Sequence, residues 1–564
     1  MTKQDITIRC QNTGETRDFP FGLTLREICE TFALKPTYPF VNARVNNQSS
    51  GLGFRIFGSK DVEFLDVTDF SGMRTYTRSL CMVLCKAVYD LVPQAKIRIE
   101  HPMSGGYYCK VDISGEAAEN GDYVLPTAAE IKARMGELIA DNLPFQRIEL
   151  PTEEAIARFG QQGMDDKVLL LETLGTLYTV LYELNGYADY FYGPLLQRTG
   201  ELQLFDLVSY YDGMLLCVPQ RKNPTQLQKA VTQEKMWETF QEYLSWQKIM
   251  NLSNVGDLNT VSASDKAGQL ICVGEALQEK RIVHIAGEIA TRMKTDTPPR
   301  IVLISGPSSS GKTTFSRRLS EQLLANGLRP YPVSLDDYFV CRENTPLDET
   351  GAYDYESLYA LDLKLFNQHL HALMDGEEVE LPTYNFITGK REYQGKRLRL
   401  DNTMVLLLEG IHALNPELTP QVPDMHKYRI YVSALTTMSL DDHNWIPTTD
   451  TRLVRRIIRD AAYRGRSAAE TIAGWNSVRD GEDKWIFPFQ ENADVMFNSA
   501  LLYEFAILRH YAEPLLQNVP QNIPQYAEAS RLLNFLQHFT PFENDHIPLT
   551  SLMREFVGGS IFRY

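Results

Sequence analysis

The chain has 564 residues, too many for one hydrophobic core, so we expect three or more domains. Its formal net charge of −16 argues against a protein whose main task is to coat nucleic acid, because phosphate contacts need Lys and Arg. The eight cysteines form no CxxC pair, no apolar run approaches about 18 residues, and the N-terminus has no signal-peptide pattern, so we expect a reduced cytoplasmic protein without membrane spans.

Residues 1–68 are predicted to form a small α/β module. Strand-like alternation in ITIRC is followed by an apparent helix, LREICETFAL, and by short strands in FVNARVN, FRIFG and VEFLDV. This order of elements predicts a ubiquitin-like β-grasp fold. The segment also resembles the TGS domain at the start of threonyl-tRNA synthetases.

Residues 69–222 resemble the second N-terminal domain of those synthetases, an α+β domain that edits mischarged tRNA. The resemblance rests on the segment RSLCMVLCKAVYDLVPQAKIRIEHPMSGGYYCKVDI. The positions of the family's zinc ligands are Arg78, Met82, Phe191 and Leu195. None of the four supplies an imidazole or a thiolate, so we expect the shape of the domain without its metal. Cys81 and Cys85, one helical turn apart, are interpreted as packing residues rather than as a metal or redox pair.

Residues 223–290 form a polar, helical pattern that we interpret as a connector. Its last predicted helix, EALQEKRIVHIAGEIATRM, is expected to pack on the next domain. The Pro-Pro pair at 298–299 then precedes a strongly apolar strand.

The predicted domain at 291–510 opens with a phosphate-binding motif. IVLIS has the pattern of a buried parallel strand and TTFSRRLSEQLL that of a helix, and GPSSSGKT between them satisfies GxxxxGK[ST]. The glycines let backbone N–H groups face a phosphate, Lys312 can reach the β- and γ-phosphates, and Thr313 can offer its hydroxyl to Mg²⁺. The predicted ATP-binding residues are Gly306, Ser308, Ser309, Ser310, Gly311, Lys312, Thr313 and Thr314.

Two further apolar strands end in carboxylates. YPVSLDDYF runs into Asp336 and Asp337, and NTMVLLLEGIHAL contains Glu409. A P-loop kinase needs such groups to hold Mg²⁺ and to accept the proton of the attacking hydroxyl. Asp336 is the predicted base, with Asp337 as the open alternative, and the predicted Mg²⁺ ligands are Thr313, Asp336 and Glu409.

Several motifs between about 295 and 500 resemble, in the same order, those of uridine kinases, which are relatives of phosphoribulokinase. SLDDYF is similar to S-x-D-x-F-Y, YDYESLYALD to the N-F-D-H-P segment, and PTYNFITGKRE to P-V-Y-D-F-x-x-H-S-R. VLLLEGIHAL matches the Walker B segment, and the longest match is DTRLVRRIIRDAAYRGR. The resemblance implies an α/β fold with a parallel P-loop sheet, and ATP and Mg²⁺ as cofactors.

The resemblance also implies roles for side chains outside the P-loop. The implied acceptor-binding residues are Glu356, Tyr384, Phe386, Arg391 and Arg456. The implied catalytic residues are Lys312, Asp336, Arg459, Arg464 and Arg466, the last two on a lid over ATP. The family's base-reading histidine and glutamine fall at Gly389 and Gly474, so the base is left unspecified.

Residues 511–564 are expected to form a helical segment that docks on the kinase domain. The predicted function is phosphorylation of a nucleoside 5′-hydroxyl by ATP, with uridine or cytidine as the family default. Two alternatives stay open: a kinase for a sugar or sugar phosphate, and an RNA-binding regulator that uses the synthetase-like half. We expect a small-molecule nucleoside as partner and a homo-oligomer; RNA is not favoured, and no membrane is involved.

Overall fold

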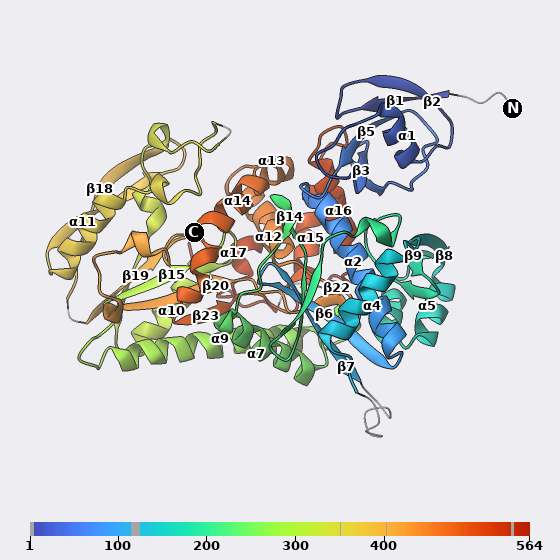
Figure 1. The fold of residues 1–564 in the computed structure, drawn as a ribbon. Coiled ribbons are helices and arrows are strands. Elements are labelled where there is room, and N and C mark those ends of the chain that lie inside the picture. The colour runs from blue at the N-terminus through green and yellow to red at the C-terminus, as the bar shows by residue number, and fades with distance from the viewer. Residues whose placement is uncertain (1–4, 114–123, 350, 402, 543–545, 564) are drawn as a thin grey trace.

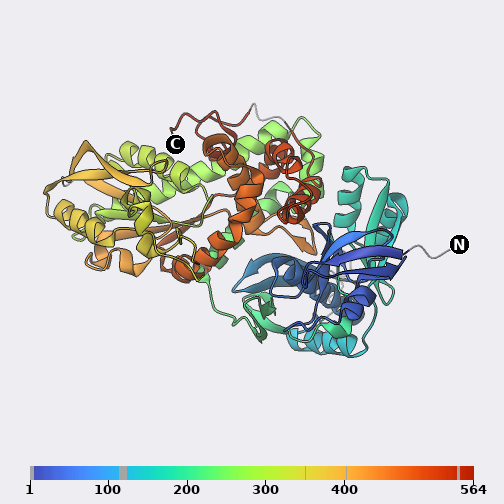
Figure 2. The ribbon, with the colours of Figure 1, turned by 90° about the horizontal axis from the view of Figure 1, so that it is seen from above.

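The computed structural model describes residues 5–113, 124–349, 351–401, 403–542 and 546–563 (Figure 1). The N-terminal sheet lies at one end of the molecule, and the hairpin of β17 (Glu378–Asn385) and β18 (Lys390–Arg399) lies at the other. Figure 2 shows the same separation from above. Among the described residues, no helix is both long and apolar enough to span a bilayer.

The first module is a five-stranded sheet with one helix. Its elements are β1 (Asp5–Cys10), β2 (Thr16–Pro20), α1 (Leu25–Phe32), β3 (Asn42–Val45), β4 (Gln48–Gly51) and β5 (Lys60–Leu65). The strand order is β2-β1-β5-β3-β4, with β1 and β5 parallel, which is the β-grasp arrangement that the sequence predicts. A capping box between Thr24 and Glu27 starts α1, and the helix buries Leu25 and Ile28 against the sheet.

The second module packs two antiparallel sheets around a long helix. Its elements are α2 (Phe70–Leu91), β6 (Ala95–Met103), β7 (Gly106–Ile113), α4 (Ala128–Ala140), β8 (Gln146–Pro151), α5 (Thr152–Gln161), α6 (Asp165–Leu174), β9 (Tyr178–Leu184), β10 (Tyr187–Asp189), β11 (Asp206–Tyr210) and β12 (Gly213–Cys217). The sheets run β11-β12-β7-β6 and β10-β9-β8. Met82, Phe191 and Leu195, at three of the family's zinc positions, are buried in one apolar cluster with Cys81 and Cys85.

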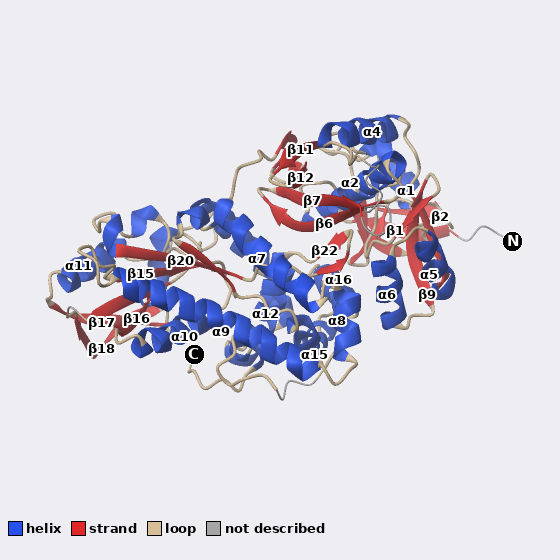
Figure 3. Ribbon diagram, turned by 90° about the horizontal axis from the view of Figure 1, so that it is seen from below, coloured by secondary structure: helices blue, strands red, loops and turns tan. Residues whose placement is uncertain are grey.

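The segment between the two halves is mainly helical. It begins with a hairpin of β13 (Pro219–Gln220) and β14 (Asn223–Leu227), so the expected connector starts in a strand. It continues with α7 (Glu234–Met250), α8 (Val255–Ser262) and α9 (Ala267–Arg292). Figure 3 shows α9 lying along α10 (Lys312–Ala325), and Ile282, Ile285 and Ile289 of α9 share a buried cluster with Phe315 and Leu319 of α10.

A parallel sheet forms the core of the kinase half, as the predicted α/β class requires. Its strands are β15 (Ile301–Ser305), β16 (Arg329–Ser334), β19 (Met404–Glu409), β20 (Lys427–Ser433) and β23 (Val495–Asn498). The order is β16-β19-β15-β20-β23, and every neighbouring pair is parallel. All five residues of β15 are buried, because helices cover both faces of a parallel sheet.

Helices complete the kinase half and bring the C-terminus back to the P-loop. They are α11 (Leu363–Met374), α12 (Thr448–Tyr463), α13 (Ala468–Ala473), α14 (Trp475–Trp485), α15 (Glu504–Gln517), α16 (Tyr526–Leu536) and α17 (Arg554–Val557). The expected boundary between residues 510 and 511 falls inside α15. Leu552 and Phe556 belong to the same buried cluster as β15 and α10, so the C-terminal segment packs on the nucleotide-binding core.

Candidate active site

The loop between β15 and α10 has a backbone that requires glycine at two positions. Gly306 has a φ of +156°, and a Cβ there would lie 1.9 Å from the carbonyl oxygen of Val432. Gly311 has a φ of +84°, and a Cβ there would lie 2.6 Å from Cδ1 of Leu552. Both glycines of the motif are therefore needed for the loop to close as it does.

The predicted Mg²⁺ ligands lie at the start of α10 and the end of β19. The Thr313 hydroxyl donates to both carboxylate oxygens of Glu409, at 3.3 Å each. Lys312 is 9% exposed, and its Nζ donates to the carbonyl oxygen of Pro307 at 3.1 Å. Burial lowers the pKa of Lys312, whereas the charges of Glu409 and Asp336 raise it, so the ammonium and these carboxylates are neighbours.

The two aspartates that follow β16 differ in their surroundings. Partial burial raises the pKa of Asp336, and the nearby cations of Lys312 and Arg464 oppose that shift. Asp337 instead accepts a hydrogen bond from the backbone N–H of Tyr384 at 3.1 Å. The geometry thus gives Asp337 a partner in β17 and places Asp336 beside the P-loop lysine.

Three of the predicted arginines gather around one aspartate at the end of α12. Arg456, Arg459 and Arg464 form ion pairs with Asp460 at 3.4, 2.9 and 3.6 Å. The Nη1 of Arg456 also donates to the Ser308 hydroxyl at 2.8 Å, which joins this group to the P-loop. Arg466 is exposed on the turn that follows α12, outside this group of ion pairs.

Glu356 lies between the arginine group and α14. Partial burial raises its pKa to about 7, the charge of Arg456 lowers it, and those of Glu482 and Asp336 raise it. A Cβ on Gly481 of α14 would lie 2.3 Å from Cβ of Glu356, so this close approach depends on glycine. The predicted acceptor-binding glutamate therefore faces the same group of charges as the P-loop.

The other predicted acceptor-binding residues lie on the β17–β18 hairpin. The rings of Tyr384 and Phe386 meet edge to face with centroids 5.1 Å apart, and Phe339 packs 5.5 Å from Tyr384. Both Nη atoms of Arg391 are 3.0 Å from Oδ2 of Asp362, so this arginine is held by an ion pair.

The two glycines at the family's base-reading positions differ in the space that is free beside them. Gly389 has a φ of +68°, and a Cβ there would lie 2.8 Å from Cβ of Arg342. The backbone N–H of Arg342 donates to the Gly389 carbonyl at 2.9 Å, and its Nη2 donates to the Phe386 carbonyl at 2.6 Å. Arg342 thus occupies the space beside Gly389. A Cβ on Gly474 would meet nothing nearer than 3.8 Å, so a side chain would fit there.

A buried ion pair that the sequence did not predict holds the P-loop. Arg452 and Glu482 are almost fully buried, with Nη2 and Oε2 2.7 Å apart. Nη1 of Arg452 donates to the Ser308 carbonyl at 3.1 Å, and the Ser308 N–H donates to Oε1 of Glu482 at 3.2 Å. The Arg-rich segment DTRLVRR was a signal for Arg452, but nothing in the sequence marked Glu482, thirty positions later.

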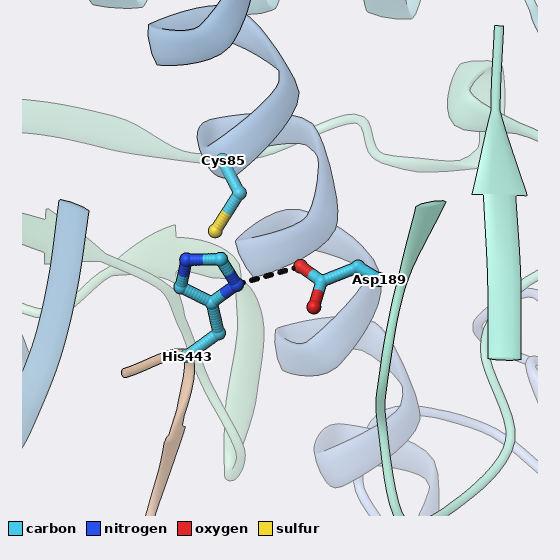
Figure 4. Close-up of side chains that lie close together, drawn as sticks. All are labelled: Cys85, Asp189 and His443. Carbon is cyan, nitrogen blue, oxygen red and sulfur yellow. Dashed lines mark hydrogen bonds and ion pairs between the residues drawn. The ribbon is translucent and has the colours of Figure 1, made fainter. Parts of the chain in front are cut away.

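A second cluster of buried side chains has the residue types of a metal site, but a lysine ammonium of the protein already neutralises its carboxylates. Cys85, Asp189 and His443 point toward one another, with ligand atoms within 4.8 Å (Figure 4). His443 Nδ1 is 2.8 Å from Oδ2 of Asp189, and the Lys167 ammonium is 3.1 Å from Oδ1 of the same carboxylate. Lys167 also lies 2.8 Å from Asp441. A cation would have to displace this ammonium, so we assign the group a structural role.

Comparisons with known proteins agree with the kinase geometry. The model of the phosphoribulokinase / uridine kinase family matches residues 301–502. The uridine kinase of Ligilactobacillus salivarius is 30% identical over 202 residues, covering 36% of this chain and 85% of that protein. The uridine kinase of Halobacterium salinarum is 28% identical over 200 residues, covering 35% and 80%.

The N-terminal region has a different relative. A threonine–tRNA ligase of Desulforamulus reducens is 26% identical over 197 residues, which cover 35% of this chain and 30% of the ligase. This match agrees with the predicted fusion of synthetase-like domains to a kinase. The chain has the P-loop and the parallel sheet of a kinase, and it matches these relatives. It therefore belongs to the phosphoribulokinase / uridine kinase family of ATP-dependent kinases.

Proposed function

We propose that the protein transfers the γ-phosphate of ATP to the 5′-hydroxyl of a nucleoside. The observation that supports this best is the meeting of Thr313, Glu409, Lys312 and Asp336 beside the P-loop. These groups supply a hydroxyl, two carboxylates and an ammonium at the carboxyl ends of neighbouring parallel strands. Such an edge is where open α/β sheets bind their ligands.

The donor set fits Mg²⁺, which prefers oxygen ligands and substrate phosphates. Thr313, Asp336 and Glu409 would hold it, and the ion would neutralise charge on the phosphates. Backbone N–H groups of the P-loop and Lys312 bind the β- and γ-phosphates. Arg456 and Arg459 stabilise charge on the transferred phosphoryl group, because guanidinium groups match phosphate oxygens.

Asp336 acts as the base that accepts the proton of the attacking hydroxyl. Its carboxylate lies among the P-loop charges, whereas Asp337 is engaged with β17. The raised pKa of Asp336 brings its basicity closer to the working pH, which suits a proton acceptor. Glu356 binds the sugar hydroxyls of the acceptor, and Tyr384 and Phe386 present aromatic faces to its base.

A sugar phosphate is the second candidate acceptor, and Arg342 supports it. This side chain lies beside Gly389, the position of the family's base-reading histidine. A guanidinium there suits a phosphate at least as well as a pyrimidine edge. The two acceptors are distinguished by the product.

The test is incubation of the purified protein with Mg²⁺-ATP and a panel of ribonucleosides, deoxyribonucleosides, sugars and sugar phosphates. ADP release is measured, and products are identified by mass. A nucleoside 5′-monophosphate is the expected product, and a bisphosphorylated sugar would replace it with the second candidate. Firm ATP binding without transfer to any acceptor would sink both kinase proposals and favour an RNA-linked regulator.

Matched variants test the assignment of the base. Asp336→Asn is expected to lower kcat by about 10²–10⁴-fold, because the amide accepts no proton. Asp337→Asn keeps an oxygen for the Tyr384 N–H and is expected to retain most of the activity. Comparable losses in both variants would contradict the assignment of Asp336.

A further inference from the structure

A cavity of about 550 Å³ lies where the N-terminal modules meet the kinase helices. Its wall includes Arg44 of β3, Arg78 of α2, Trp475 of α14 and Arg531 of α16. An ion pair of 2.9 Å between Arg74 of α2 and Glu528 of α16 joins the two sides. The P-loop residues 306–313 do not line this space, and its volume is typical of a small-molecule site.

The wall of the cavity carries more positive than negative side chains, although the protein as a whole is acidic. Five arginines and three carboxylates line it: Arg44, Arg74, Arg78, Arg479 and Arg531, with Asp69, Asp450 and Glu528. The three carboxylates are already used, as shown by the pairs Arg44–Asp69 (2.7 Å), Arg74–Glu528 (2.9 Å) and Arg531–Asp450 (2.7 Å). Arg479 has Glu482 at 3.7 Å, but that carboxylate also pairs with Arg452.

Arg78 has no such partner. It is 7% exposed, and within the described parts of the chain no hydrogen bond or ion pair joins its side chain to another residue. Its guanidinium lies over the ring of Tyr192, 5.3 Å from the centroid, and against Gly193, where a Cβ would lie 2.3 Å from Nη1. Burial lowers the pKa of Arg78 to about 10, so the guanidinium is still charged near neutral pH. A buried positive charge is costly without an anion nearby.

The other groups in the wall suit a nucleotide. Phe70, Tyr192 and Trp475 supply aromatic side chains, and Gln48, Asn476 and Asn534 supply amides that both donate and accept hydrogen bonds. The guanidinium fork of arginine matches phosphate oxygens. We propose that this cavity is a second ligand site, which binds a phosphorylated nucleotide with its phosphate on Arg78.

A ligand in this position would touch both halves of the protein. Trp475, which lines the cavity, also lies beneath Arg452 and Arg456, whose guanidinium carbons are 5.4 and 5.9 Å from its ring centroid. Both arginines contact Ser308 of the P-loop. The site would therefore give the synthetase-like half a direct role beside the kinase.

The test uses the full chain with its P-loop first saturated by Mg²⁺ and a non-hydrolysable ATP analogue. Inorganic phosphate, pyrophosphate and the nucleoside mono-, di- and triphosphates are then titrated by calorimetry, with tRNA as a separate arm. One further equivalent of at least one nucleotide is expected to bind. If no small phosphate binds, or if only tRNA does, the proposal is wrong.

Two variants locate the binding. Arg78→Met removes the guanidinium but keeps an apolar stem, and it is expected to weaken nucleotide binding by at least about tenfold. Arg147→Met, at an exposed arginine of β8 outside the cavity, is the matched control and should leave binding unchanged. The nucleotide should raise the Tm of the unmodified protein and of the control, but not that of Arg78→Met.

A further variant in the cavity wall tests the site if Arg78→Met fails to fold. Ser530 lies in the wall on α16 and is partly exposed, so Ser530→Glu adds a carboxylate without removing a buried group. Repulsion of phosphate should again weaken binding by about tenfold or more. Unchanged affinity in both cavity variants would overturn the proposal. This result does not depend on whether the acceptor of the kinase is a nucleoside.

Discussion

At the scale of single residues, the P-loop is held by side chains that lie outside its motif. The carboxylate of Glu482 accepts the N–H of Ser308, while Arg452 donates to the carbonyl of the same residue. Both charges are buried, so each depends on the other to offset the loss of water. The conformation of Ser308, and with it the predicted phosphate cradle, rests on this pair.

Glu482→Gln tests this support. The change leaves the Arg452 charge buried with a neutral partner, so the free energy of unfolding should fall by about 3 kcal/mol. Affinity for an ATP analogue should fall as well, because Ser308 loses its fixed position. Glu378→Gln, which breaks an exposed pair with Arg397, should change stability by about 0–1 kcal/mol. Denaturant unfolding and calorimetry measure both quantities, and equal effects of the two changes would contradict this account.

Gly311→Ala tests the requirement for a positive φ in the loop. The new Cβ would meet Leu552, and the left-handed backbone would cost about 1–3 kcal/mol. We therefore expect a lower Tm and weaker binding of an ATP analogue. Gly136→Ala, in α4 with nothing within 4 Å of the new Cβ, should be neutral or stabilising. Normal nucleotide binding by Gly311→Ala would show that the loop tolerates a different backbone.

At the scale of elements, the short helix α17 closes over the start of α10. Glu555 is 7% exposed, and its Oε2 accepts from the hydroxyl of Thr314 at 2.5 Å. Leu552, just before α17, packs on Gly311. The end of the chain thus serves as part of the wall behind the nucleotide-binding loop.

Glu555→Ala measures what this contact contributes. Loss of a charge-assisted hydrogen bond at the first turn of α10 should weaken binding of an ATP analogue by about tenfold. The control is Glu321→Ala, an exposed glutamate on the same helix, which should leave affinity unchanged. If the two variants bind the analogue equally, α17 is only a packing element.

At the scale of the whole molecule, a buried network of charges joins the N-terminal half to the kinase half. Asp189 of β10 contacts both Lys167 of α6 and His443, which follows β21 (Ser439–Asp441). Burial is the largest single influence on the pKa of His443 and lowers it, but the charge of Asp189, its hydrogen bond to the ring and the charge of Asp441 together raise the pKa by more, so the net shift is upward. Lys167 lowers the pKa of His443, and Asp441 raises it. The pKa of Asp189 is lowered, because His443 and Lys167 outweigh its burial.

This network predicts a pH dependence of stability. Since the folded pKa of His443 is raised, its contribution is complete below the unfolded value of about 6.5 and is lost as the pH rises through the folded value. His443→Gln should therefore be less stable than the unmodified protein near pH 6, and the difference should shrink toward pH 9. Denaturant unfolding over this range measures it. A difference that stays constant with pH would mean that the pKa of His443 is the same in the folded and the unfolded protein.

Much of the fold and part of the site could be predicted from the sequence, because their signals are local. The P-loop, its strand and its helix occupy one continuous segment, and the strand and helix order of residues 1–68 already implied a β-grasp sheet. Asp336 and Glu409 could be predicted as candidate site residues because each follows an apolar strand. The lid roles of Arg464 and Arg466 stay predictions: both side chains are exposed after α12, and of the two only Arg464 forms an ion pair with Asp460.

Only the tertiary structure decided which distant residues meet. Glu555 reaches Thr314 across 241 positions, Glu482 reaches Arg452 across 30, and Arg342 lies against Gly389. The cavity around Arg78 likewise joins side chains from the β-grasp module, α2, α14 and α16. Backbone conformation and apolar periodicity depend on residues that are neighbours in the sequence, whereas the partner of a buried charge depends on how the modules pack. The sequence by itself therefore determined the kinase core, and the packing of its two halves determined what surrounds it.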